Sequence, residues 1–139
     1  GNFAKTMLRL AQERDKLTII NDQHGTPTGA DLIADVTAHA MRCVLSMQDQ
    51  SLGGVYHLVP SGETTWHGYA SHVIEKARDI KPDLQFKVAE LAPVPTSAFP
   101  TPAKRPLNSR LCTHKLQQAF GLVLPQWQQG VDRMLAEIL

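Results

Sequence analysis

The stretch from Ile20 to Leu32, INDQHGTPTGADL, holds polar, Gly and Pro residues whose side chains could contact a ligand. It interrupts an apolar run and precedes helix-like periodicity, so it is either a plain strand-to-helix connection or a built site. Gln23 offers both a hydrogen-bond donor and an acceptor. Thr28, which follows a proline and precedes the expected helix, is placed to cap that helix. Both interpretations of the loop stay open on local chemistry alone.

Six histidines invite a metal-site interpretation, but their spacing does not favour one. His67 and His72 are five residues apart, whereas ligands on one helix face need a spacing of three or four. His57 lies within the apolar run VYHLV and is interpreted as a strand histidine whose hydrogen bonds are satisfied. We therefore expect no histidine metal site.

The sequence contains no complete catalytic constellation. A dinucleotide-binding fingerprint needs G-x-G-x-x-G after a strand, and the glycines at 25, 29, 53 and 54 do not supply it. A Tyr-x-x-x-Lys pair for proton transfer is also missing, because Pro60 stands four after Tyr56 and Val73 stands four after Tyr69. No P-loop, H-E-x-x-H or G-x-S-x-G motif occurs.

Composition and charge narrow the class of protein. The chain has 139 residues, of which 42% are hydrophobic and 19% charged, and this fits one packed domain. A net charge of +1 with scattered Lys and Arg argues against nucleic-acid binding. No stretch approaches the roughly 18 apolar residues of a membrane span, and no signal peptide is recognised. Cys43 and Cys112 form no CxxC pair and fit two thiols in a reducing cytosol. Since the chain begins with Gly1 rather than Met, we expect a piece of a longer protein.

The apolar periodicity predicts alternating helices and strands, and therefore an α/β fold. Helices are predicted over residues 2–15, 29–46, 66–79, 113–120 and from Pro125 to the end. Strands are predicted over residues 16–20, 55–59 and 84–91. Thr64 or Thr65 is expected to cap the third helix, with Trp66 on its buried stripe. Five prolines between residues 92 and 109 exclude a regular helix or a central strand there.

Six segments of the sequence, quoted below, together resemble the C-terminal half of the bacterial dTDP-4-dehydrorhamnose reductases. That family belongs to the extended short-chain dehydrogenase/reductases of the NAD(P)-binding Rossmann superfamily. The stretches are GNFAKTMLRLA, INDQHGTPTGADLIAD, GVYHLV, GETTWHGYA, VPTSAFPTPAKRPLNSRL and LPQWQQGVDRML. The motifs DQ-x-G-x-PT and RP-x-NS-x-L are specific in combination, although related sugar-nucleotide reductases share parts of both. The resemblance covers essentially the whole chain.

The resemblance implies a function for the full-length enzyme. Such a reductase reduces the 4-keto group of dTDP-6-deoxy-L-lyxo-4-hexulose with NADPH, giving dTDP-L-rhamnose for O-antigen and other cell-envelope polysaccharides. Residues 1–139 would be its substrate-binding portion, and the NADPH-binding domain with the catalytic Tyr and Lys would lie upstream. The resemblance also implies a cytoplasmic homodimer without nucleic-acid or membrane partners. The alternative is a non-catalytic, reductase-like binding or regulatory module.

The resemblance implies a fold as well. Residues 29–46 and 55–59 would belong to the Rossmann sheet region, and the segment from Thr65 onward would form the smaller substrate-binding lobe. A chain without the upstream half would be inactive alone. It would also expose apolar surface, and we expect marginal stability or self-association.

The resemblance further suggests contacts for the dTDP-sugar. Arg105, on a proline-stiffened loop, is the first candidate for the diphosphate, and the alternative is a solvated surface arginine. Asn2 and Phe3 begin the first helix, which in the family faces the nucleotide; Phe3 is alternatively a core residue. Gln23 and Thr28 complete the set of expected substrate-binding residues.

The family can also dimerise around a divalent cation held by carboxylates. Asp31 and Glu137 fall where acidic ligands are expected, and such oxygens suit Mg²⁺. A further acidic ligand would lie upstream, and the alternative is two surface acids. His24 departs from the apolar or aromatic residue usual in the family, and no role is assigned to it.

Overall fold

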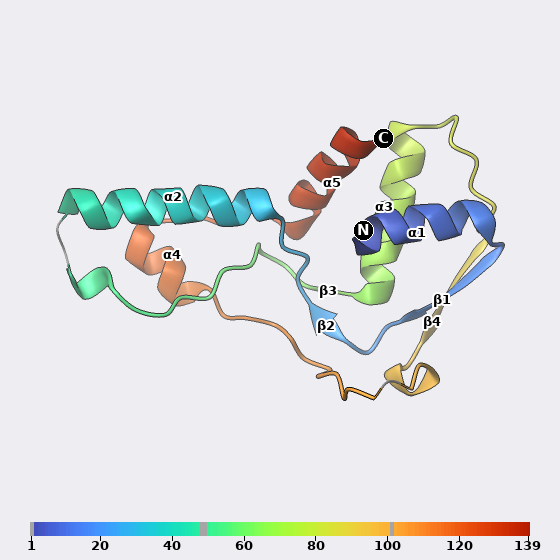
Figure 1. Cartoon of the computed structure of the whole chain (residues 1–139), viewed down its shortest axis with the longest axis horizontal. Helices are drawn as coiled ribbons and strands as arrows, with labels where there is room; N and C mark the ends of the chain where they lie inside the picture. Colours follow the sequence, from blue (N-terminus) through green and yellow to red (C-terminus); the bar gives the residue numbers. More distant parts are fainter. Residues whose placement is uncertain (1, 48–49, 101) are drawn as a thin grey trace.

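The computed structural model describes residues 2–47, 50–100 and 102–139. The chain forms two lobes joined by extended segments (Figure 1). The larger lobe contains α1 (Phe3–Glu13), β1 (Lys16–Ile20), α3 (Trp66–Ile80), β4 (Glu90–Val94) and α5 (Trp127–Ile138). The smaller lobe contains α2 (Ala30–Met47), η1 (Gln50–Leu52) and α4 (His114–Phe120). Three short elements lie between or beside the lobes: β2 (His24–Gly25), β3 (Thr64–Thr65) and η2 (Thr96–Ala98).

The larger lobe is built on α3, which packs against α1 and α5. Its helix stripe places Val73 and Ala77 in the same buried cluster as Leu8 of α1 and Leu135 of α5. A second cluster lies between the helices and β1, and includes Ile74. Burial of these apolar side chains is the main force that holds the lobe together. The smaller lobe has its own core, formed by Val36, Leu116, Phe120 and Leu124.

β1 and β4 form a parallel pair in which Lys16 lies opposite Glu90 and Ile20 opposite Val94. The predicted strand over residues 84–91 is therefore wrong in its boundaries, because the ladder begins only where β1 offers a partner. Val88, before the strand, is buried and donates its N–H to the Ala11 carbonyl oxygen at 3.0 Å. β4 tolerates a proline because β1 is its only neighbour in the described part of the chain.

The predicted strand over residues 55–59 is not formed. A strand exists only as part of a hydrogen-bonded pair, and these residues have no ladder partner in the ranges that the structure covers. Val55 is 80% exposed, contrary to the expectation of burial on both faces. His57 is also exposed and lies outside any strand. Tyr56 instead packs its ring against Phe120 at a centroid distance of 5.1 Å.

The helix predictions are confirmed in type and position, with corrections at their ends. Thr65 caps α3, since its Oγ1 accepts the Gly68 N–H at 3.1 Å. α4 ends at Gly121, whose φ of 62° is readily adopted by glycine. The last helix begins at Trp127 rather than Pro125. The Pro125 carbonyl oxygen instead accepts the N–H of Ser61 at 2.7 Å, which ties it to another loop.

No helix in residues 2–47, 50–100 and 102–139 combines the length and apolar character needed to cross a membrane.

Candidate functional site

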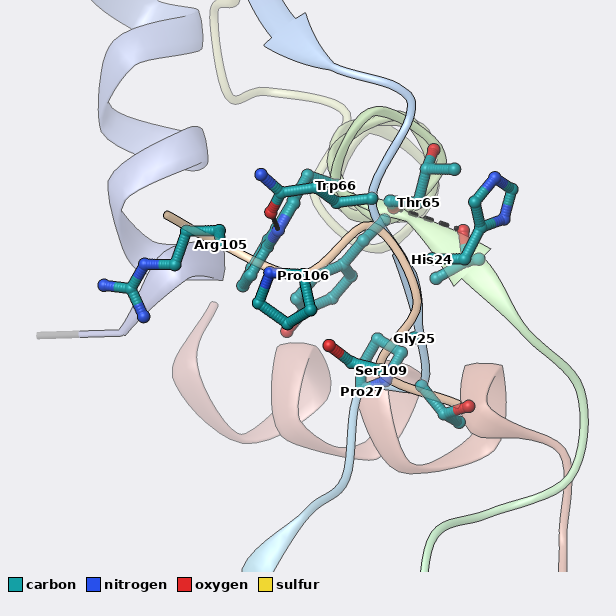
Figure 2. A pocket seen from close by; sticks show the side chains of 12 residues that line it. His24, Gly25, Pro27, Thr65, Trp66, Arg105, Pro106 and Ser109 are labelled. Carbon is teal, nitrogen blue, oxygen red and sulfur yellow. Dashed lines mark hydrogen bonds between the residues drawn. The ribbon is translucent and has the colours of Figure 1, made fainter. Parts of the chain in front are cut away.

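A cavity of about 390 Å³ opens beside the short β2–β3 pair, where three segments distant in sequence meet (Figure 2). Its lining comes from the loop after β1, the start of α3 and the proline-rich segment. The lining residues are Gln23, His24, Gly25, Thr26, Pro27, Thr64, Thr65, Trp66, Tyr69, Arg105, Pro106 and Ser109. This volume is in the range of ligand pockets, which extends from roughly 300 to 1,000 Å³.

Backbone hydrogen bonds around His24 bring the three segments together. His24 pairs with Thr65 in the antiparallel β2–β3 ladder. On the other side, its N–H donates to the Leu107 carbonyl at 2.8 Å and its carbonyl accepts the Ser109 N–H at 2.8 Å. The two motifs noted in the sequence, DQ-x-G-x-PT and RP-x-NS-x-L, therefore lie side by side. These contacts need only the main chain of His24, so the ladder places no demand on its side chain.

Aromatic rings form one wall of the cavity. Trp66 and Tyr69 stand one turn apart at the start of α3, and both contact Phe3, with ring centroids 4.7 Å and 5.2 Å away. Trp66 is 42% exposed, so its predicted place on the buried stripe of the helix is wrong. It is the first residue after the N-cap Thr65, at the N-terminal end of α3, which borders the cavity. Burial raises the pKa of the Tyr69 hydroxyl above its ordinary value of 10.0.

Gln23 lies in the cavity wall, as expected, but both ends of its amide are bonded to the protein. Its Oε1 accepts the indole Nε1–H of Trp66 at 3.1 Å. Its Nε2 donates to the Thr96 hydroxyl at 3.0 Å. Gln23 therefore orders the wall rather than presenting a free amide.

Asp22 and Thr96, which sequence reasoning missed, stand directly behind Gln23. The Thr96 hydroxyl donates to Asp22 Oδ1 at 2.6 Å, and the Thr96 N–H lies 2.9 Å from each carboxylate oxygen. These bonds, chiefly the one from the hydroxyl, hold the pKa of the Asp22 carboxyl below its ordinary value of 3.8. The signal in the sequence was the acidic residue beside Gln23, but nothing local connects it to Thr96.

Arg105 lies on the exposed loop at the edge of the cavity (Figure 2). Among the described residues, none forms a hydrogen bond or ion pair with its guanidinium. Five N–H donors on a fixed planar fork thus remain available to an anion. Arg105 stays a predicted contact, and the structure places it in the lining of the cavity.

The other expected contacts have local partners. Asn2 caps α1, because its Oδ1 accepts the Lys5 N–H at 2.9 Å, and it does not line the cavity. Phe3 supports the aromatic wall from behind. Thr28 lies outside the cavity. The prediction that it caps the following helix is wrong, because its hydroxyl donates to the Thr26 carbonyl at 3.1 Å. Gly29 precedes α2 directly instead.

Asp31 and Glu137 do approach each other, through Arg133. The Arg133 Nε lies 3.5 Å from Asp31 Oδ2 and 3.3 Å from Glu137 Oε1, and all three side chains are exposed. Within the part of the chain that the structure covers, no group of three or more His, Cys, Asp or Glu residues could hold a metal ion. The two carboxylates contact a guanidinium in this structure, and their role as metal ligands stays a prediction.

Comparison with known proteins decides the family. Residues 1–139 match the family model of the RmlD substrate binding domain. The chain belongs to this family. The match extends over every residue, so the predicted resemblance is confirmed along the whole chain.

Curated relatives of this RmlD substrate-binding domain are named dTDP-4-dehydrorhamnose reductase. The relative from Escherichia coli K12 is 59% identical over 138 residues, covering 99% of this chain and 45% of its own length. The relative from Burkholderia thailandensis is 42% identical over 142 residues, and the match covers 99% of this chain and 47% of that relative. The chain therefore spans less than half the length of these curated relatives.

Solved structures agree on the fold. A dTDP-4-dehydrorhamnose reductase from Bacillus anthracis, in complex with NADP, is 30% identical with a TM-score of 0.72. The match covers 99% of this chain and 43% of that one. A Clostridium acetobutylicum ortholog is 28% identical with a TM-score of 0.72. The predicted α/β fold of the C-terminal portion of an extended short-chain dehydrogenase/reductase is confirmed.

Proposed function

We propose that this chain is the sugar-nucleotide-binding part of a dTDP-4-dehydrorhamnose reductase. The whole enzyme would reduce the 4-keto group of dTDP-6-deoxy-L-lyxo-4-hexulose to dTDP-L-rhamnose, with NADPH as the hydride donor. The observation that carries the proposal is the guanidinium of Arg105, which has no partner among the described residues, at the edge of a cavity walled by aromatic rings. A nucleotide diphosphate sugar combines an anionic diphosphate with flat rings, and it suits such a lining.

The nicotinamide cofactor does not fit the residues of this chain. The chain has no glycine fingerprint to cradle a pyrophosphate, and neither tyrosine is followed four residues later by a lysine. We therefore assign NADPH and the catalytic Tyr and Lys to the portion of the relatives that this chain does not cover. The role of residues 1–139 is to bind and orient the sugar nucleotide.

Assembly and location belong to the same proposal. By analogy with the reductase family, the full-length protein would act as a cytoplasmic homodimer in dTDP-rhamnose and O-antigen synthesis, without nucleic-acid or membrane partners. A divalent cation at its interface would have to displace Arg133 from Asp31 and Glu137 and find another carboxylate elsewhere.

The alternative function is a non-catalytic binding or regulatory module of the same fold. A missing catalytic pair within residues 1–139 does not distinguish the two, because both place that pair outside this chain. A Tyr-x-x-x-Lys in the natural upstream sequence would support the reductase. A substituted pair there would favour the non-catalytic binding module instead.

Calorimetric titration with dTDP tests the proposed site. We expect weak, saturable binding that Arg105→Ala weakens by about tenfold, because a charge-assisted pair with the diphosphate is lost. Lys104→Ala is the matched control, since it removes the same charge from the neighbouring position without touching the cavity lining. Equal affinities of the two variants would remove Arg105 from the site, and no binding by the unmodified chain would contradict the proposed function.

A further inference from the structure

A chain of hydrogen bonds runs from the aromatic wall of the cavity to a carboxylate outside it. The indole of Trp66 donates to Gln23, Gln23 donates to Thr96, and Thr96 donates to Asp22, at 3.1, 3.0 and 2.6 Å. Neither Asp22 nor Thr96 lines the cavity. We call these four residues the Trp66 relay.

The chemistry of its members fixes the direction of every bond in the relay. An indole N–H can only donate, so it must meet the carbonyl oxygen of the Gln23 amide. The amide nitrogen then points to the Thr96 hydroxyl, which accepts that bond and donates its own hydrogen bond to Asp22. An ionised carboxylate accepts only, and the additional bond from the Thr96 N–H holds it in place. A flipped amide would set two donors against each other, so the relay has one arrangement.

The relay acts on a side chain that is only partly held by packing. Trp66 is 42% exposed at the start of its helix, so packing against neighbours covers only part of its ring. Phe3 supports the indole from one side, and the relay holds its Nε1 end. A ring fixed before the ligand arrives avoids the loss of side-chain entropy on binding.

We propose that Asp22 and Thr96 are positioning residues of the sugar-nucleotide site. They act through Gln23 and set the orientation of the Trp66 indole, against which a ring of the nucleotide sugar rests. This inference depends on the proposed function for its ligand, whereas the ordering of Trp66 is a property of the ligand-free protein. The two can therefore fail separately.

The test measures the indole and the affinity in the same variants of the full chain. Thr96→Val keeps the shape of the side chain and removes the hydroxyl, and Thr96→Ser restores it. Thr18→Val is the matched control, because Thr18 is exposed on β1 and outside the relay. The readouts are the exchange rate of the Trp66 indole proton with water, by NMR, and the dissociation constant for dTDP, by calorimetry.

We expect Thr96→Val to speed exchange of the indole proton severalfold and to weaken dTDP binding about three- to tenfold. Thr96→Ser and Thr18→Val should both stay within about twofold of the unmodified chain. If Thr96→Val does not fold, Gln23→Met breaks the relay at the next position and should give the same two changes. Indole exchange and affinity equal to those of Thr18→Val would overturn the inference. Faster exchange together with an unchanged dTDP affinity would also overturn it, since the relay would then order Trp66 without serving the site.

The proposed function fails by a different result. If Trp66→Ala and Arg105→Ala both leave dTDP affinity unchanged, the cavity is not the nucleotide site. The indole exchange rates would still report whether Asp22 and Thr96 order Trp66.

Discussion

At the scale of single residues, the site depends on side chains whose partners are far away in the sequence. Asp22 is an example, because both of its oxygens are bonded by Thr96, which follows the other strand of the parallel β1–β4 pair. Arg133 is another, because besides Glu137 on its own helix it contacts Asp31 of α2, about a hundred residues earlier. In both cases the role of a charged group follows from its partner rather than from its own type.

The lowered pKa of Asp22 predicts a pH-dependent contribution to stability. A carboxyl whose pKa is lower in the folded than in the unfolded chain stabilises the fold above the unfolded value of 3.8. That contribution is lost as the pH falls from 3.8 through the folded value. Asp22→Asn should therefore lower the free energy of unfolding at pH 7 and pH 5, with a smaller difference below pH 3.8.

Urea unfolding at several pH values measures this difference. Asp35→Asn is the control, since it removes an equal charge from an exposed position on α2. A difference between the unmodified chain and Asp22→Asn that grows as the pH falls below 3.8 would contradict the assigned bonds.

Arg133 predicts how the two carboxylates of the expected metal site respond to cations. With the guanidinium between Asp31 and Glu137, added Mn²⁺ should cause no saturable broadening of NMR signals at either residue. Arg133→Ala frees both carboxylates and should allow weak broadening there. Saturable broadening at both residues in the unmodified chain would show that a cation displaces Arg133.

At the scale of elements, the junction of the loop after β1 with α3 positions the cavity. Thr65 caps α3 and also donates its hydroxyl to Asn21 Oδ1 at 2.6 Å, so one side chain joins the helix to the loop. The aromatic wall stands on the first turn of this helix, and its geometry depends on where the helix begins.

The cap at Thr65 predicts that Thr65→Ala lowers stability more than Thr28→Ala. Thr65→Ala should destabilise the chain by about 1–2 kcal/mol, because both the cap and the bond to Asn21 are lost. Thr28→Ala should change stability by less than about 0.5 kcal/mol, because that hydroxyl bonds only to the carbonyl two residues earlier. Thermal unfolding followed by circular dichroism measures both, and equal losses would show that Thr28 caps its helix after all.

At the scale of the whole molecule, the smaller lobe leaves apolar surface uncovered. Met41, Val44 and Leu45 lie close together on α2 and are all exposed, and Leu45 is 74% exposed. Contiguous apolar surface of this kind favours association.

The exposed face of α2 predicts concentration-dependent self-association. Leu45→Glu should shift the chain toward monomer, because a carboxylate resists burial in an apolar contact. Val123→Glu is the control, since Val123 is 93% exposed but lies outside α2. Sedimentation velocity at several concentrations measures the association of the two variants. A Leu45→Glu chain that associates as strongly as the Val123→Glu chain would place the contact elsewhere.

The absence of a catalytic pair predicts that residues 1–139 alone do not turn over substrate. Mixed with NADPH and a dTDP-4-keto-6-deoxy sugar, the chain should not speed the decrease of NADPH absorbance above the background rate. Measurable oxidation by the isolated chain would show that the catalytic groups lie within these residues.

The helices and the family follow from local sequence patterns. Residues 3–13, 66–80 and 114–120 form helices because their apolar positions recur at helical spacing and their ends carry Asn2, Thr65 and Gly121. The motif pairs were sufficient for the resemblance, and Arg105 stood out because a guanidinium on a stiff loop suits a diphosphate. These are local properties, which a sequence states directly.

The pairing of strands and of distant side chains depends on tertiary contacts. Whether residues 55–59 form a strand depends on a neighbouring strand, and whether β4 begins at residue 84 or 90 depends on where β1 lies. The roles of Gln23, Trp66 and Asp22 depend on Thr96, which is more than 70 residues away from Gln23 and Asp22 in the sequence. A hydrogen bond acts over about 3 Å in space, whatever the distance along the chain, so such partners become visible only once the chain is folded.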